Sequence, residues 1–229
     1  MSAAKAKKGG GTRESAEEKR DRAAEIDRRL ADAYPDTDIS LDWSNPLELL
    51  VSTILSAQCT DERVREVTKD LFREYRTPED YADADRSELE AAIRSTGFFR
   101  NKAKHIQGAA KKICGEYGGK VPDTMEELLT LPGVARKTAN VVLSNAFGKN
   151  EGIVVDTHVK RVSRRLGLAS SSNPEKIERS LMEVLPKNRW RTFAWRLILH
   201  GRTVCHGRKD PECDRCVLSD LCPSAFSFG

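Results

Sequence analysis

The chain has 229 residues, of which 38% are hydrophobic, 32% are charged and 6% are aromatic. That share of apolar side chains suffices for a folded core and excludes a wholly disordered chain, and no apolar run approaches the ~18 residues that a membrane-spanning helix needs, so we expect no membrane partner. The 39 Lys and Arg against 35 Asp and Glu give a net charge of +4, which is too small to identify a binding partner by itself.

Residues 1–14 are predicted to form a flexible basic tail. Four cations lie there among small residues, and no apolar stretch follows them: Lys5, Lys7, Lys8 and Arg13. Because a secretory signal needs such a stretch, we expect a protein that stays in the cytoplasm. In that reducing compartment cysteines are expected as free thiols or metal ligands rather than disulfides.

Helix signals recur along the rest of the chain, whereas strand signals are almost absent. Ser15 and Glu18 form a capping box that opens a helix running to Tyr34, just before Pro35. Further helices are delimited by caps at the start and by Gly or Pro at the end. One short helix starts at residue 77, and the others cover residues 47–57, 60–75, 87–95, 101–117, 125–131, 134–147, 156–166, 174–185 and 189–200. This succession of short helices predicts an all-α protein.

The six cysteines divide into two isolated and four clustered residues. Cys59 and Cys114 lie in helical patterns and are predicted to be small buried apolar residues. The other four follow a C-x7-C-x2-C-x5-C pattern that predicts a metal site: Cys205, Cys213, Cys216 and Cys222. Structural zinc usually has two C-x2-C pairs, whereas an iron–sulfur cluster accepts uneven spacing, so the pattern favours a cluster and leaves zinc as the alternative.

The loop between the first two of these cysteines carries two neighbouring cations. Arg208 and Lys209 lie near its tip, and the loop is tethered by a cysteine at each end. Both are therefore candidate contacts to phosphate. Two ordinary solvated surface cations would explain the same residues equally well.

Residues 131–139 contain a sharp turn between two predicted helices. The turn contains Pro132 and Gly133. We predict a positive φ at Gly133, since only glycine adopts such a φ at low cost. The second helix begins at once, and its first backbone N–H groups form an anion site suited to a DNA phosphate. Lys137 lies in the first turn of that helix, where on its own it would be taken for an ordinary surface charge.

An aspartate follows an apolar run nineteen residues after this lysine. Asp156 stands where a helix N-cap is expected, and capping alone would explain it. The helix that it opens is rich in cations and is predicted to line a DNA backbone: Lys160, Arg161, Arg164 and Arg165.

Taken together and in this order, these motifs resemble the endonuclease III family, the bifunctional DNA glycosylase/AP lyases of the helix-hairpin-helix superfamily. The resemblance covers residues 47–222. It rests on four segments that precede the clustered cysteines: Leu55-Ser56-Ala57-Gln58, Leu131–Val142, Val155-Asp156-Thr157-His158 and Leu197–Arg202.

The resemblance implies two helical lobes with the active site in the cleft between them. A six-helix bundle with the helix-hairpin-helix would cover residues 39–148, and an iron–sulfur lobe would combine residues 15–38 and 149–229. The four clustered cysteines would hold a [4Fe–4S] cluster. The partner would be double-stranded DNA with oxidised pyrimidines or abasic sites, bound by a monomer at the nucleoid.

The resemblance also implies roles for individual residues. Lys137 and Asp156 would be the catalytic pair, cutting the strand 3′ to the abasic site by β-elimination. Gln58 would fill the gap left by the extruded base, and Phe98 would be a wedge on the opposite strand, with Phe99 or simple core packing as alternatives. The remaining predicted DNA contacts are Gly133, Ala135, Arg136, His158, Arg208 and Lys209.

Two departures from the family pattern stand out. Family members usually have glycine where this chain has Ala135, whose methyl group would approach a phosphate less closely. The first cysteine interval is usually six residues and here it is seven.

The chemistry requires a neutral amine to attack C1′ and to form a Schiff base. A free lysine, with a pKa of about 10.4, is almost wholly protonated near neutral pH. Desolvation in the cleft and the positive end of the hairpin helix would favour the neutral amine, whereas a carboxylate would oppose it. We therefore assign Asp156 to stabilising the charge that develops at C1′ and to taking the proton that the amine loses.

Two other functions compete with this prediction. A monofunctional mismatch glycosylase would lack the lysine at position 137, and the adenine type would extend further beyond Cys222. A non-catalytic DNA-binding module would have the hairpin and the metal lobe but no nucleophilic amine.

Overall fold

The computed structural model describes residues 14–227, so the predicted basic tail lies almost entirely outside the described residues. Within that range the chain is all-helical and contains no strand, as predicted. The α-helices are α1 (Ala16–Ala33), α2 (Pro46–Leu55), α3 (Asp61–Glu74), α4 (Pro78–Asp83), α5 (Arg86–Ala92), α6 (Phe99–Glu116), α7 (Met125–Leu128), α8 (Arg136–Ala146), α9 (Thr157–Arg165), α10 (Pro174–Val184) and α11 (Trp190–Thr203). Four 3-10 helices are η1 (Arg94–Thr96), η2 (Lys187–Arg189), η3 (Cys213–Arg215) and η4 (Ser219–Leu221).

Most helix starts follow the predicted capping chemistry. The Ser15–Glu18 capping box opens α1, since each side chain bonds the backbone N–H of the other. Asn45 caps α2 ahead of Pro46 at the first helical position. Each cap satisfies backbone donors that have no partner inside the helix, which explains why these boundaries can be read from the sequence.

Two predicted boundaries are wrong in a way that matters for the site. The helix predicted over residues 47–57 ends at Leu55, and the turn that follows places Gln58 at a left-handed φ of 53°. Cys59 therefore lies in this turn rather than in a helix, and it is only partly buried, as is Cys114. The helix predicted from residue 101 begins two residues earlier, because Phe98 serves as its N-cap with a φ of 49°.

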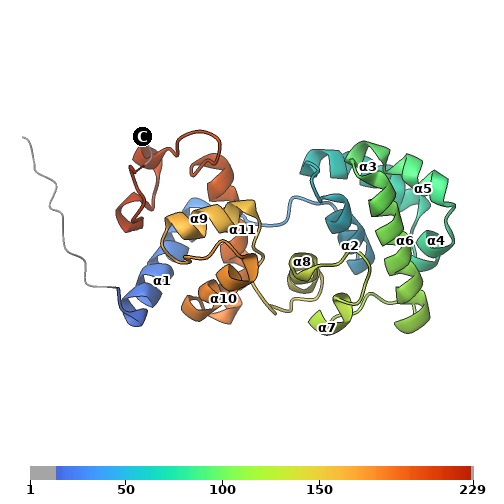
Figure 1. Ribbon diagram of the computed structural model, residues 1–229, viewed down its shortest axis with the longest axis horizontal. Coiled ribbons are helices and arrows are strands. Elements are labelled where there is room, and N and C mark those ends of the chain that lie inside the picture. The colour runs from blue at the N-terminus through green and yellow to red at the C-terminus, as the bar shows by residue number, and fades with distance from the viewer. Residues whose placement is uncertain (1–13, 228–229) are drawn as a thin grey trace, which may run out of the picture.

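The helices form two lobes that lie side by side (Figure 1). The bundle lobe contains α2 to α8, with α4 packed on α6 and α2 on α8. The sequence of α2 is apolar on nearly every side, and eight of its ten residues are buried. This helix therefore forms the centre of the bundle lobe.

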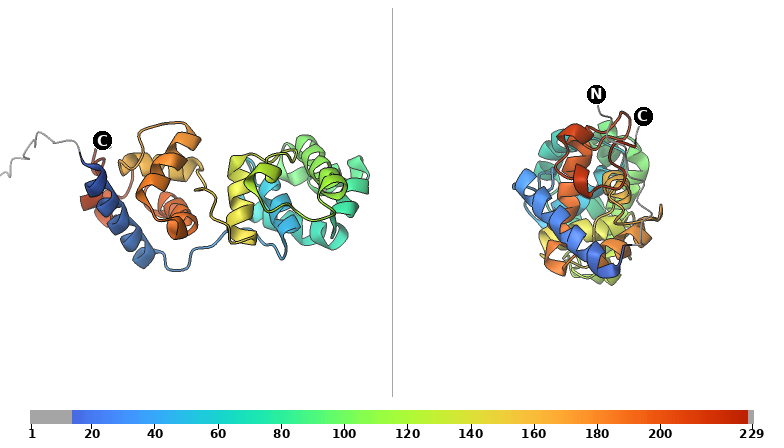
Figure 2. Two further views of the ribbon diagram at one scale, coloured as in Figure 1. Left: turned by 90° about the horizontal axis from the view of Figure 1, so that it is seen from below. Right: turned by 90° about the vertical axis from the view of Figure 1, so that its left-hand side faces the viewer.

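The second lobe, which we call the four-cysteine lobe, combines α1 with α9, α10, α11 and the C-terminal loop. Helix α11 packs on α9 and on α1, so the two ends of the described chain meet in one lobe. Figure 2 shows that two segments cross between the lobes, one after α1 and one after α8. None of the helices in residues 14–227 is long and apolar enough to span a membrane.

Candidate active site

The hairpin between α7 and α8 has the predicted geometry. Gly133 has a φ of 79°, and a Cβ atom added there would lie 2.6 Å from the His105 Cβ. Glycine is thus required at this position both by its backbone conformation and by the close approach of α6. Ala135, by contrast, has an ordinary extended backbone, φ −94° and ψ 169°, and is the N-cap of α8. The departure from glycine at this position therefore introduces no backbone strain.

Lys137 and Asp156 line one pocket between the two lobes. Lys137 extends from the first turn of α8, and within residues 14–227 its side chain makes no hydrogen bond or ion pair. One carboxylate oxygen of Asp156 caps α9 by accepting the Val159 N–H at 2.8 Å. The second oxygen has no hydrogen-bond partner in the described part of the chain. The site thus combines a free amine with a carboxylate that is oriented by one bond and open on its other side.

The predicted desolvation of this lysine is not provided by the protein alone. Lys137 is exposed, and Asp156 is half-buried. Since desolvation requires water to be excluded, that part of the prediction is wrong for the free protein. Covering of the pocket by a bound duplex would have to provide it.

An ion pair that sequence reasoning missed spans this pocket. Asp61, at the start of α3, accepts a hydrogen bond from Arg202 of α11 at 2.9 Å, and both residues line the pocket of Lys137. The pair joins the bundle lobe to the four-cysteine lobe at the mouth of the site. The pairing of Asp61 with Arg202 had no sequence signal because the two residues are 141 positions apart.

A buried carboxylate forms a second polar link between the lobes. Glu178 of α10 accepts hydrogen bonds from Arg136 at 2.7 Å and from Asn140 at 2.9 Å. Gly152 leaves room for it, because a Cβ at that glycine would lie 1.8 Å from the Glu178 Oε1. The guanidinium of Arg136, predicted to contact DNA, is therefore engaged with the other lobe in the free protein.

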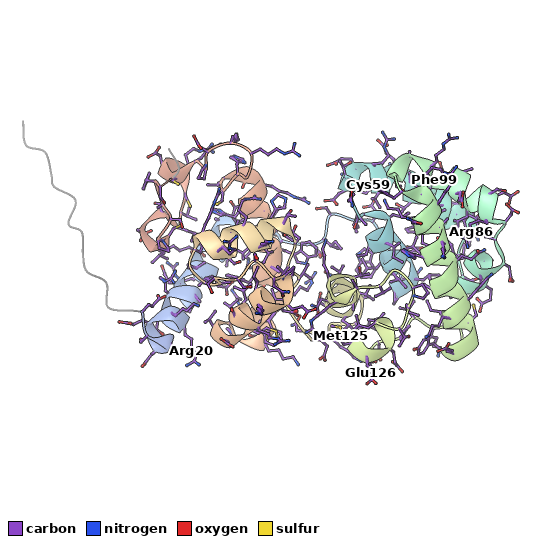
Figure 3. The ribbon with its side chains drawn as sticks, viewed as in Figure 1. Arg20, Cys59, Arg86, Phe99, Met125 and Glu126 are labelled. Carbon is purple, nitrogen blue, oxygen red and sulfur yellow. The ribbon has the colours of Figure 1, made fainter. Side chains whose placement is uncertain are left out.

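The residues predicted to enter the duplex lie together on the bundle lobe. Gln58, Phe98 and Gly133 line one groove beside the hairpin. Phe98 is 63% exposed, whereas Phe99 packs partly against the core and lies beside Arg100, whose guanidinium carbon is 5.3 Å from the ring centroid. Figure 3 shows Phe99 and Cys59 near the same end of this lobe. Of the two phenylalanines, Phe98 is thus the one available to a partner.

Both Gln58 and Phe98 have left-handed backbone conformations, which are uncommon for residues other than glycine. Such conformations cost roughly 1–2 kcal/mol each and persist only where the surroundings impose them. Phe226, near the C-terminus, is the third such residue within residues 14–227, so in the bundle lobe these conformations fall at the two positions predicted to enter the duplex.

The four clustered cysteines line a single small pocket with His200 and Arg165. Arg165 donates to the Cys205 Sγ at 3.2 Å and to the His206 carbonyl at 2.6 Å. Arg161 donates to the carbonyls of Cys205 and Gly201. The predicted basic face of α9 is therefore divided, because the guanidinium groups of these two arginines bond the cysteine loop.

Lys160 and Arg164 form the outward part of that face. Together with Thr157 they recur at helical spacing, and they line an open groove with Ser170 and Ser224. Within residues 14–227 neither cation has an ion-pair partner. Four of the residues lining this groove are cationic and none is acidic.

The other predicted contacts differ in exposure. Arg208 and Lys209 are both exposed, and Lys209 makes one long ion pair of 3.5 Å with Glu212. His158 is half-buried, with its ring Nδ1 3.1 Å from an Arg161 nitrogen, and burial lowers the pKa of His158. The structure thus leaves the loop tip open to a ligand and places His158 in packing against α11 and Arg161.

The fold and the site define a helix-hairpin-helix base-excision DNA repair protein. Residues 51–187 match the model of the HhH-GPD superfamily base excision DNA repair protein family. A solved structure of a trapped endonuclease III–DNA covalent intermediate is similar to this chain, with a TM-score of 0.85, 44% identity, and coverage of 90% of this chain and 96% of that chain.

More specifically, the chain belongs to the endonuclease III family of DNA glycosylase/AP lyases. It is 58% identical to endonuclease III of Synechocystis sp. over 207 residues, covering 90% of this chain and 94% of the relative. It is 48% identical to endonuclease III of Bacillus subtilis, covering 85% of this chain and 88% of the relative. The resemblance stated from the sequence motifs is confirmed.

Proposed function

We propose that this base-excision enzyme removes oxidised pyrimidines from duplex DNA with Lys137 as its nucleophile and Asp156 as the partner of that lysine. The observation that carries the proposal is the placement of a free amine and a half-free carboxylate in one pocket at the junction of the lobes. A lysine with no partner within residues 14–227 has no evident structural task there.

The reaction would proceed through an imine between Lys137 and C1′ of the damaged nucleotide. The neutral Lys137 amine attacks C1′, the bond from C1′ to the base breaks, and the base leaves with the bonding electrons. The free oxygen of Asp156 stabilises the positive charge developing at C1′ and takes the proton lost by the amine. The C1′–O4′ bond of the sugar then breaks as O4′ takes a proton, and the lysine nitrogen forms a protonated imine with C1′. This imine makes a C2′ proton acidic, and removal of that proton expels the 3′ phosphate by β-elimination. Hydrolysis of the imine releases Lys137.

Access to C1′ requires the damaged nucleotide to leave the base stack, which costs a few kcal/mol. We assign Gln58 and Phe98 to filling the gap that this nucleotide leaves in the duplex. The N–H groups around Gly133 and Ala135 would bind a backbone phosphate, with Arg136, His158, Arg208 and Lys209 as further contacts.

The proposal is tested by borohydride trapping on a duplex that contains thymine glycol, with the matching undamaged duplex as the control. An amine nucleophile forms an imine that borohydride reduces to a stable covalent adduct. We expect an adduct with the lesion duplex only. A monofunctional glycosylase or a non-catalytic DNA-binding module would give none.

We assign a [4Fe–4S] cluster to Cys205, Cys213, Cys216 and Cys222. In the described part of the chain no group of three or more His, Cys, Asp or Glu side chains is arranged to hold one metal ion, yet these four thiols line one pocket. Donors spread around a cavity suit a cubane better than a single zinc ion. When bound, the cluster would cross-link the C-terminal loop to itself between Cys205 and Cys222, in the pocket that Arg165 and His200 also line.

Iron analysis tests this assignment, together with the absorbance band near 400 nm expected of a cluster. We expect about four iron atoms per chain in the purified protein. Burial raises the pKa of the Cys216 thiol to about 11, so a metal-free Cys216 is protonated and cluster binding must release its proton. Replacement of Cys213 by alanine is expected to remove the band and lower the Tm. Stoichiometric zinc without iron would contradict the assignment.

We further propose that the outward face of α9 binds the DNA backbone. Replacing both Lys160 and Arg164 by alanine is expected to reduce the slope of log K against log salt by about 1.8, since each phosphate contact contributes about 0.9. Binding to undamaged duplex, measured between 50 and 200 mM salt, provides the slope. The matched control is the double alanine variant of Lys176 and Arg179, two exposed cations on α10. Equal slopes for the two double variants would contradict the proposal.

The lobe boundaries, assembly state and location complete the proposal. We place the boundaries at residues 39–148 for the bundle lobe and at 15–38 with 149–229 for the four-cysteine lobe. We propose that the protein acts as a monomer. A repair enzyme for chromosomal DNA is expected at the nucleoid.

A further inference from the structure

Lys102 is a buried cation whose bonds join two separate turns. It lies one turn into α6 and is 4% exposed. Its ammonium group donates to the Leu55 carbonyl at 2.7 Å and to the Thr96 carbonyl at 2.8 Å. Within residues 14–227 it has no ion-pair partner, and burial lowers the pKa of Lys102.

The two carbonyls lie directly before the two strained turns. Leu55 ends α2 and is three residues before Gln58, and Thr96 ends η1 and is two residues before Phe98. Carbonyls at the end of a helix lack an internal partner and carry partial negative charge, which explains why a cation is tolerated in this buried position without a carboxylate.

The same lysine also lines the groove formed by Gln58, Phe98 and Gly133. A single rigid point of attachment therefore lies under both residues assigned to the duplex gap. Within residues 14–227 no other side chain donates hydrogen bonds to both turns, and a left-handed residue of this kind relaxes when its surroundings no longer impose it.

We propose that Lys102 is a positioning residue that holds the Gln58 turn and the Phe98 turn at a fixed separation, so that both side chains enter the duplex together. The inference rests on the proposed function, because it concerns the residues that occupy the gap left by the extruded base. It adds that the two side chains act as one unit and that this unit depends on a third side chain that does not touch DNA.

The test is a mutant cycle on lesion selectivity. Selectivity is the ratio of Kd for undamaged duplex to Kd for the same duplex with an uncleavable tetrahydrofuran abasic analogue. Lys102→Met keeps the length of the side chain but removes its donors. We expect it to lower selectivity roughly tenfold, because the duplex gap is then filled less well. In the Gln58→Ala/Phe98→Ala background the same change is expected to have no further effect.

Controls separate this role from charge and from stability. Lys104→Met removes an exposed charge two residues along the same helix and is expected to leave selectivity unchanged. Lys102→Arg retains donors and charge and is expected to restore selectivity to within about threefold of the parent. If Lys102→Met is too unstable to assay, Lys102→Gln takes its place and must show the same loss and the same lack of additivity.

The outcomes are distinguishable. Equal losses of affinity for both duplexes in Lys102→Met would show a purely electrostatic effect and overturn the inference. An undiminished loss in the Gln58→Ala/Phe98→Ala background would overturn it as well. If Gln58→Ala and Phe98→Ala themselves leave selectivity unchanged, the proposed function of those two residues fails instead.

Discussion

Replacing Lys137 by alanine is expected to abolish borohydride trapping and to slow strand nicking at a thymine glycol by at least about 10³-fold. In the proposed mechanism this amine forms the covalent bond to C1′, and among the described residues no other lysine lines its pocket. Because the side chain is exposed and unbonded within residues 14–227, its removal should leave the Tm unchanged. A loss of activity in this variant therefore reports on chemistry rather than on folding.

Two further variants sharpen this prediction. Lys137→Arg retains the positive charge, but its guanidinium stays protonated and cannot attack, so DNA binding should persist while trapping is lost. Lys111→Ala removes an exposed cation from α6, away from the pocket, and should nick at the parental rate. If the Lys137→Ala protein nicks lesion-bearing duplex as fast as the parent, the assignment of the nucleophile is wrong.

The parts of the fold that could be predicted from the sequence are those determined by local interactions. Ser15, Asn45 and Gly133 act within three or four residues of their own position, through caps and a turn. Such signals identify a helix end whatever the rest of the protein does. The helical class, the hairpin and most boundaries follow from them.

The parts that could not be predicted depend on contacts distant in sequence. Helical spacing places Arg161 and Arg164 on one basic helix, but only packing shows that the guanidinium of Arg161 bonds the Cys205 carbonyl while Arg164 is exposed. Lysine is a residue type that usually lies at the surface, yet Lys102 is buried. Its two hydrogen-bond acceptors belong to turns whose positions could not be predicted from the sequence. The exposure of Lys137 likewise depends on how the two lobes meet.

The candidate site shows the same division. The pairing of a lysine with an aspartate came from motif order, and the structure brings both into one pocket. The polar links across the lobe junction, Asp61 with Arg202 and Arg136 with Glu178, had no sequence signal, since each carboxylate is more than forty positions from its partner. These links help to set the relative orientation of the two halves of the site, and hence the separation of Lys137 from Asp156.

Replacing Asp156 by asparagine is expected to slow base excision about 10²–10³-fold with little change in stability. The aspartate has a structural task as the N-cap of α9, where its Oδ1 accepts the Val159 N–H. Asparagine caps a helix about as well as aspartate, so the substitution preserves that bond and removes only the charge and the basic oxygen. The Tm should therefore change little, whereas the carboxylate is no longer available to balance charge at C1′ or to accept the amine proton.

Single-turnover rates on thymine glycol duplex, with the enzyme in excess, provide the measurement, and thermal unfolding provides the control for the cap. Asp156→Ala removes both tasks and should combine the slow rate with a loss of about 1 kcal/mol of stability. Asp156→Ser restores a good cap without a carboxylate, and it should regain the stability but not the rate. Base excision by Asp156→Asn at the parental rate would reduce Asp156 to a cap and leave Lys137 without its proton acceptor.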